Sequence, residues 1–127
     1  MTGRSELRIS LHAQAGETKP VRTALGAFLG AIGIESVVRD DILTATGEAL
    51  VNAVEHAYEG APAGPVELFA HYEAAGKLSI DVCDGGRFIE RENRPERGLG
   101  LRIMRAIAET VTIDTASGTA IRMVFKT

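Results

Sequence analysis

The chain has 127 residues, of which 45% are hydrophobic and 24% charged, the balance of an ordinary globular domain with one core. Its formal net charge of -3 argues against nucleic acid as a direct partner, because nucleic-acid-binding domains carry a basic excess. The single cysteine, Cys83, excludes a disulfide within the chain and fits a reducing compartment. No apolar run reaches the roughly 18 residues that a membrane helix needs. We therefore expect a cytoplasmic protein, or a cytoplasmic domain of a longer one, without membrane contact.

The first half of the chain predicts one strand and two helices. Apolar residues alternate with polar ones over 7–12, which predicts a strand with one buried face. Apolar residues recur at helical spacing over 18–32 and predict a first helix. A second helix is predicted over 36–58.

The second half predicts two hairpins separated by a loop and a helix. After the breaker cluster GAPAGP, two alternating runs over 66–72 and 78–82 flank the turn AAGK and predict a hairpin. The segment 84–97 has many charges and no periodicity, which indicates a mobile loop. A helix is predicted from about Leu99 to Glu109, and the final alternating runs around ASG predict a second hairpin.

This order of elements predicts a single domain, 1–127, of the α+β class. Adjacent alternating strands favour a mixed, mostly antiparallel sheet. The helices are expected to cover one face of that sheet, which makes a two-layer sandwich.

The stretch TGEALVNAVEHAYEG carries polar residues that would share one face of a regular helix: Glu48, Asn52, Glu55, His56 and Glu59. One interpretation is a solvated face, which suits Glu55 and Glu59. The other is a ligand site, because Glu48 and Asn52 lie one turn apart and their oxygens can converge on Mg²⁺. Asn is also a weak choice for a solvated helix interior. This pattern alone leaves both interpretations open.

Two glycine-containing stretches are further candidates. In VCDGG a strand ends at Asp84, which indicates either an ordinary turn or a carboxylate that points into a pocket, with Gly86 allowing a close ligand. In RGLGLRIM two glycines precede a predicted helix, which indicates either a simple junction or a phosphate cradle. The residues of that candidate cradle are Arg97, Gly98, Leu99, Gly100 and Leu101.

The order EALVNAVEHAY, a strand ending in DGG, RGLGLRIM and a late GT resembles the GHKL ATPase superfamily, and most closely its anti-sigma-factor serine kinase branch. The resemblance spans roughly residues 42–125 and implies the ATP-binding fold of that superfamily. It implies that Glu48 is the catalytic base and Asn52 the Mg²⁺ ligand. It also implies that Asp84 binds the adenine amino group, with Gly86 beside it.

The resemblance further implies that Gly98 and Gly100, with their neighbours Arg97, Leu99 and Leu101, lie at the phosphates of ATP. Thr119, which follows Gly118, matches a threonine near the adenine. Residues 87–97 occupy the place of the ATP lid. One departure is that Asp84, Gly85, Gly86, Arg87 and Phe88 lack the last glycine of the superfamily's DxGxG motif.

The function that the resemblance implies is an ATP- and Mg²⁺-dependent protein serine kinase that is also an anti-sigma factor. Such a protein sequesters a sigma factor and phosphorylates a serine of a STAS-domain antagonist, and the branch implies a homodimer. The missing glycine leaves an alternative open, a non-catalytic or weakly nucleotide-binding module that only sequesters its partners. A third hypothesis, the ATP-binding half of a sensor histidine kinase, finds no phospho-accepting histidine on a preceding helix pair.

Overall fold

The computed structural model describes residues 4–58, 60, 62–73, 75–86 and 95–127, with the backbone alone at 4, 15, 56 and 95–98. A short 3-10 turn at Ala15–Glu17 precedes the first helix. The helices, strands and one π turn follow in the order β1 (Arg4–His12), α1 (Thr18–Ala31), α2 (Ser36–Val51), the π turn (Asn52–His56), β2 (Pro65–Glu73), β3 (Lys77–Asp84), α3 (Pro95–Ile107), β4 (Thr110–Asp114) and β5 (Thr119–Lys126).

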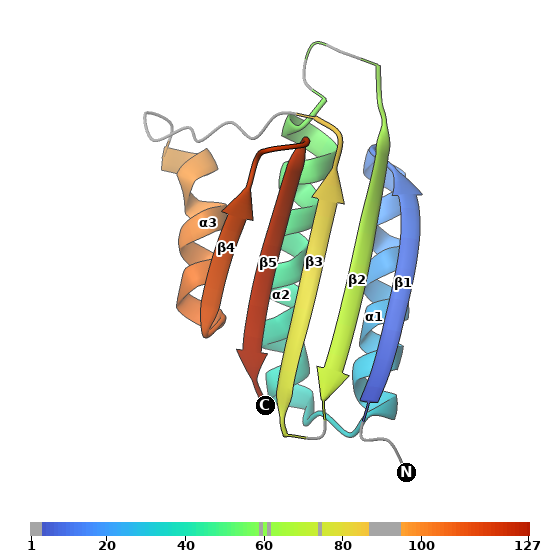
Figure 1. Ribbon diagram of the computed structural model, residues 1–127, viewed down its shortest axis with the longest axis vertical. Coiled ribbons are helices and arrows are strands. Elements are labelled where there is room, and N and C mark those ends of the chain that lie inside the picture. The colour runs from blue at the N-terminus through green and yellow to red at the C-terminus, as the bar shows by residue number, and fades with distance from the viewer. Residues whose placement is uncertain (1–3, 59, 61, 74, 87–94) are drawn as a thin grey trace.

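The described strands form one sheet in the order β1-β2-β3-β5-β4, and every pairing is antiparallel. The three α-helices lie behind one face of this sheet (Figure 1). This arrangement confirms the predicted α+β two-layer sandwich and resolves its sheet as antiparallel. Because α3 separates β3 from β4, the last hairpin folds back so that β5, and not β4, pairs with β3.

The core lies between the sheet and the helices. It is formed by the apolar residues that alternate along the strands and recur at helical spacing along the helices. Alternate strand residues such as Leu68, Ile80 and Met123 are fully buried on the inner face, as are Leu25 and Leu50 of the facing helices. Burying one such side chain stabilises the fold by roughly 1.5–3 kcal/mol relative to leaving it exposed. The layers therefore hold the ends of the elements in fixed positions.

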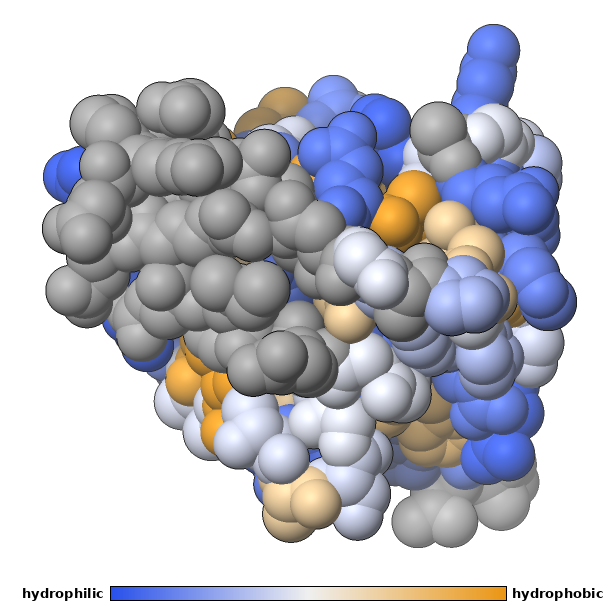
Figure 2. Space-filling model, turned by 90° about the horizontal axis from the view of Figure 1, so that it is seen from above, coloured by the Kyte–Doolittle hydropathy of each residue, from blue (hydrophilic) through white to orange (hydrophobic). Residues whose placement is uncertain are grey.

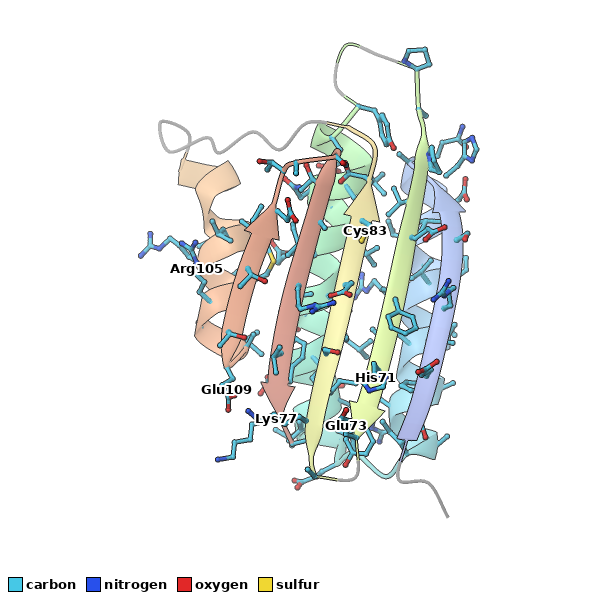
Figure 3. All side chains as sticks on the ribbon, in the orientation of Figure 1. His71, Glu73, Lys77, Cys83, Arg105 and Glu109 are labelled. Atoms are coloured by element: carbon cyan, nitrogen blue, oxygen red, sulfur yellow. The ribbon has the colours of Figure 1, made fainter. Side chains whose placement is uncertain are left out.

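On the other face of the sheet, where no helix of the described residues lies, polar side chains form pairs. Arg122 forms two hydrogen bonds to Asp81, at 2.7 and 2.8 Å, and Arg8 stacks 4.9 Å from the centre of the Phe69 ring. Cys83 lies half-buried on this face, near the end of β3 (Figure 3). Burial, with nearby carboxylates adding to it, raises the pKa of its thiol.

Two predicted helix boundaries were wrong. The helix predicted over 36–58 is α-helical only to Val51 and continues as a π turn, in which the Ala57 N–H donates to the Asn52 carbonyl at 3.0 Å. The last helix begins at Pro95 rather than near Leu99, because proline suits a first helical turn. Most of the predicted mobile loop, residues 87–94, lies outside the described residues. No helix of the described part is long and apolar enough to cross a membrane.

Candidate functional site

The predicted site residues come from elements that meet at one end of the sheet. There α2 and β3 end and β5 and α3 begin, which is the upper end in Figure 1. Figure 2 looks onto this end and shows hydrophilic residues with apolar ones exposed between them over the described part. The topology therefore brings together segments that are far apart in the sequence.

Asp84 and Thr119 are direct cross-strand partners in the register of β3 and β5. Both face the core side, and only 8% of Asp84 and 1% of Thr119 is exposed. The Thr119 hydroxyl oxygen has no hydrogen-bond partner among the described residues. Buried polar groups are almost always paired in a functioning protein, so an unpaired hydroxyl beside a buried carboxylate marks a place for a polar ligand.

The Asp84 carboxylate is held by the turn that follows β3. Its Oδ1 accepts a hydrogen bond from the Gly86 N–H at 2.8 Å. Burial raises the pKa of Asp84, and this hydrogen bond offsets part of the rise. A carboxylate held in this way gains from a ligand that donates a hydrogen bond to it.

Glycines keep the backbone close around this pair. A Cβ on Gly86 would collide with the Ala57 carbonyl oxygen, and one on Gly118 with the Asp84 carbonyl oxygen. Gly118 also has a φ of +87°, which side chains rarely tolerate. The end of the helical segment, the turn after β3 and the start of β5 therefore approach one another more closely than other residues would allow.

Glu48 of α2 and Asn52, the first residue of the π turn, lie one turn apart, and Glu48 lies against α3. The Glu48 side chain is half-buried, and a Cβ built on Gly100 would lie 3.1 Å from its Oε1. The Asn52 Nδ2 is buried without a hydrogen-bond partner in the described part of the chain, and so is the hydroxyl of Thr46 on α2. The unpartnered Asn52 amide nitrogen and the unpartnered Thr119 hydroxyl thus both belong to predicted site residues.

Glu48 and Asn52 are the residues of this end of the molecule that could contribute ligands to Mg²⁺. Glu48 and Asn52 offer carboxylate and amide oxygens, the ligands that hard cations prefer. The described residues contain no group of three or more His, Cys, Asp and Glu that could hold a metal ion. Mg²⁺ commonly binds through one or two protein groups together with phosphates and water, which is the pattern these residues could supply.

The predicted polar helix face does not continue past Asn52. The π turn uses one residue more per turn than an α-helix, so it rotates the following residues by about 100° relative to a regular helix. Glu55 is exposed on this turn. Glu59 and the side chain of His56 lie outside the described residues. The five polar positions therefore do not form one continuous face.

The RGLGL stretch also lies differently from the prediction. Since α3 begins at Pro95, the N–H groups without partners inside the helix belong to the turn that starts there, with the backbone of Arg97 in it. Gly98 follows, and Gly100 and Leu101 lie further inside the helix. Leu99 is 48% exposed. Gly100 thus permits the close contact with Glu48 and is not a free donor at a helix start.

One residue at this end of the molecule was missed from the sequence. The Tyr58 hydroxyl donates to the Pro65 carbonyl and accepts from the Gly85 N–H, each at 2.7 Å. In the sequence it was only the last residue of a predicted helix. Its position directly before a glycine- and proline-rich connection was the available signal, because such connections often need a side chain to fix them.

The family follows from comparison with known proteins. The model of the histidine kinase-like ATPase domain family matches residues 11–125, so the chain belongs to this family. An anti-sigma F factor of Halalkalibacterium halodurans is 29% identical over 122 residues, covering 87% of this chain and 83% of that protein.

Two further similarities concern RsbW proteins. The serine-protein kinase RsbW of Bacillus pumilus is 29% identical over 122 residues, covering 81% of this chain and 74% of that protein. The solved structure of the RsbU and RsbW domains of a Mycobacterium tuberculosis protein matches with a TM-score of 0.78 and 26% identity. That match covers 96% of this chain and 32% of the solved chain, which is therefore much longer.

Proposed function

We propose that this domain is an ATP-dependent protein serine kinase and anti-sigma factor. In this proposal it sequesters a sigma factor and phosphorylates a serine of a STAS-domain antagonist. The observation that carries the proposal is the buried Asp84–Thr119 pair at the same end of the sheet as Glu48 and Asn52. The names of the relatives, anti-sigma F factor and serine-protein kinase, support the same function.

Asp84 and Thr119 would recognise the adenine of ATP. The other oxygen of the Asp84 carboxylate, Oδ2, would be a suitable acceptor for the 6-amino group of the base, and the Thr119 hydroxyl would supply a second polar contact. Gly86, with no side chain, lets the Ala57 backbone approach closely and holds its N–H against the Asp84 carboxylate, which would keep that carboxylate in place for the base.

Glu48 and Asn52 would serve the transfer itself. Bound ATP supplies the γ-phosphoryl group, and Mg²⁺ neutralises its charge. The Asn52 amide oxygen would bind Mg²⁺. Glu48 would orient the serine hydroxyl and accept its proton as the serine oxygen takes the γ-phosphoryl group, whose bond to the bridging oxygen breaks so that ADP leaves. The first turn of α3, together with Arg97, Gly98, Leu99, Gly100 and Leu101, would lie over the phosphates and contribute the positive end of a helix dipole.

The proposal includes a cellular setting and an assembly. We place the domain in the cytoplasm, where sigma factors and ATP are found, and we infer a homodimer from the branch that the sequence resembles. Light scattering of the purified chain tests the assembly, because a monomer would give the 13.5 kDa of one chain.

The experiment that tests the function uses the purified chain, Mg²⁺-ATP and candidate STAS-domain proteins. Calorimetry is expected to detect binding of Mg²⁺-ATP, and mass spectrometry to detect phosphoserine on one partner. Absence of ATP binding would contradict the proposal altogether. ATP binding without transfer to any partner, while a sigma factor is still captured, would instead favour the sequestering module.

A further inference from the structure

Tyr58 joins three segments that are distant in the sequence. It follows the π turn, and its hydroxyl bonds both the first residue of β2, Pro65, and the turn after β3 at Gly85, at 2.7 Å each. A tyrosine hydroxyl has one proton to donate and oxygen lone pairs to accept, so both bonds form together. The hydroxyl is thus a single connection between the helical segment, β2 and the turn.

The surroundings are shaped to receive this ring. A Cβ on Gly64 would lie 2.5 Å from two ring carbons of Tyr58, so only glycine lets the ring occupy its place. A Cβ on Gly85 would lie 3.2 Å from the hydroxyl oxygen. The π turn contributes as well, because without its rotation of about 100° a regular helix would direct Tyr58 away from the sheet.

The turn that Tyr58 holds is the one that carries Asp84. The Gly86 N–H bonds the Asp84 carboxylate at 2.8 Å, and Gly86 itself packs against the Ala57 carbonyl. Gly85 lies between these two residues, and its N–H donates a hydrogen bond to Tyr58 Oη. The position of the Asp84 carboxylate therefore depends on where Tyr58 holds the Gly85 backbone.

We propose that Tyr58 is a positioning residue that sets the selectivity of the nucleotide site for adenine. This inference rests on the proposed function, in which Asp84 recognises the 6-amino group of the base. A turn that is already ordered spares the bound nucleotide the cost of ordering it. Loss of the hydroxyl loosens the turn and weakens the contact that is specific to adenine, while contacts to the ribose and phosphates remain.

The test compares ATP with inosine triphosphate, which has the same ribose and phosphates and carries an oxygen in place of the 6-amino group. Calorimetry on the full chain with Mg²⁺ gives the ratio of the two affinities. For Tyr58→Phe we expect ATP affinity to fall about tenfold, equivalent to about 1.4 kcal/mol. Affinity for inosine triphosphate is expected to stay within about twofold, since Asp84 gains nothing from that base.

Two further variants keep the test decisive. Gly64→Ala retains every hydroxyl but displaces the Tyr58 ring. It should therefore also lower the ratio of the affinity for ATP to the affinity for inosine triphosphate. If Tyr58→Phe does not fold, Gly64→Ala tests the proposal alone. Tyr72→Phe removes the hydroxyl of the chain's other tyrosine, on β2 between His71 and Glu73 at the far end of the sheet (Figure 3), and should leave the ratio unchanged.

The outcomes separate the two proposals. A wild-type chain that binds neither nucleotide, or binds both equally, overturns the adenine site of the proposed function and this inference with it. A wild-type chain that prefers ATP, with variants that weaken both nucleotides equally or keep the wild-type ratio, overturns the role of Tyr58 alone.

Discussion

At the scale of single residues, Asp84 shows how a binding group conflicts with stability. Its carboxylate is buried, and burial disfavours the charged form that a base amino group would need. The fold accepts this because the Gly86 N–H offsets part of the desolvation. Asp84 is therefore better explained by a ligand than by packing.

Asp84→Asn is expected to separate the two effects. The amide keeps an oxygen for the Gly86 N–H but directs a donor at the adenine amino group, so ATP affinity should fall at least about tenfold. Calorimetry measures this loss, with the exposed α2 residue variant Asp40→Asn as control. An Asp84→Asn protein with wild-type ATP affinity would show that this carboxylate does not bind the base.

The same variant has a pH signature. The pKa of Asp84 is raised in the folded state, so its contribution to stability is full below the unfolded-state pKa and is lost as the pH rises through the folded-state pKa. Asp84→Asn should therefore be at least as stable as wild type at pH 7, and the difference should shrink on acidification. Urea unfolding across this pH range measures it, and a variant less stable at pH 7 would contradict the sign.

Asn52 makes a second prediction at this scale. Asn52→Ala removes the proposed amide ligand and also the buried, unpartnered Nδ2. We expect the Mg²⁺-dependent part of ATP binding to disappear while the protein stays folded. Calorimetry with and without Mg²⁺ measures this, with the exposed Thr44→Ala on the same helix as control. If Asn52→Ala keeps the full Mg²⁺-dependent part of ATP binding, Asn52 is not the Mg²⁺ ligand.

At the scale of elements, the contact between α2 and α3 controls where Glu48 lies. Gly100, inside α3, lets that helix approach until a Cβ would be 3.1 Å from the Glu48 carboxylate. Glycine costs a helix interior roughly 0.5–1 kcal/mol relative to alanine. Its presence at this position is thus explained by the close contact and not by helix stability.

Gly100→Ala is expected to raise stability and lower activity. Alanine favours the helix by up to about 1 kcal/mol, whereas its Cβ forces the Glu48 carboxylate to shift. We expect a higher Tm and transfer about tenfold slower, since small misplacements of reacting groups are costly. Gly26→Ala is the matched control, because its Cβ would lie 3.6 Å from a Leu43 methyl, an ordinary contact that should stabilise without slowing transfer.

At the scale of the whole molecule, sequence periodicity predicted the strands and helices of the two layers but not where some of the helices end and begin. Alternation over 7–12, 66–72 and 78–82 marked strands with one buried face, and β1, β2 and β3 appear there. The π turn was not predicted, because no pattern in the sequence distinguishes it from a continued α-helix. Its end also lies against Gly86, almost thirty residues away in sequence. The start of α3 at Pro95 was missed because charges there resemble those of a loop.

The site was predicted residue by residue from resemblance, whereas its geometry required the fold. No local pattern pairs Asp84 with Thr119, since their register depends on the return of β5 beside β3. Tyr58 was missed for the same reason, because its partners Pro65 and Gly85 belong to other elements. The sheet thus brings together at one end the candidate site residues, which are spread over more than half the length of the sequence.

The measurement that tests most directly whether Glu48 is the catalytic base of a serine kinase is serine phosphorylation by the Glu48→Gln variant. Glutamine keeps the shape of Glu48 but cannot accept a proton, so ATP affinity should persist while transfer to the STAS-domain partner falls by a factor of roughly 10²–10⁴. Mass spectrometry of the partner over time gives the rate, and calorimetry gives the affinity. Transfer at the wild-type rate in Glu48→Gln would contradict the assignment of Glu48 as the catalytic base of a serine kinase.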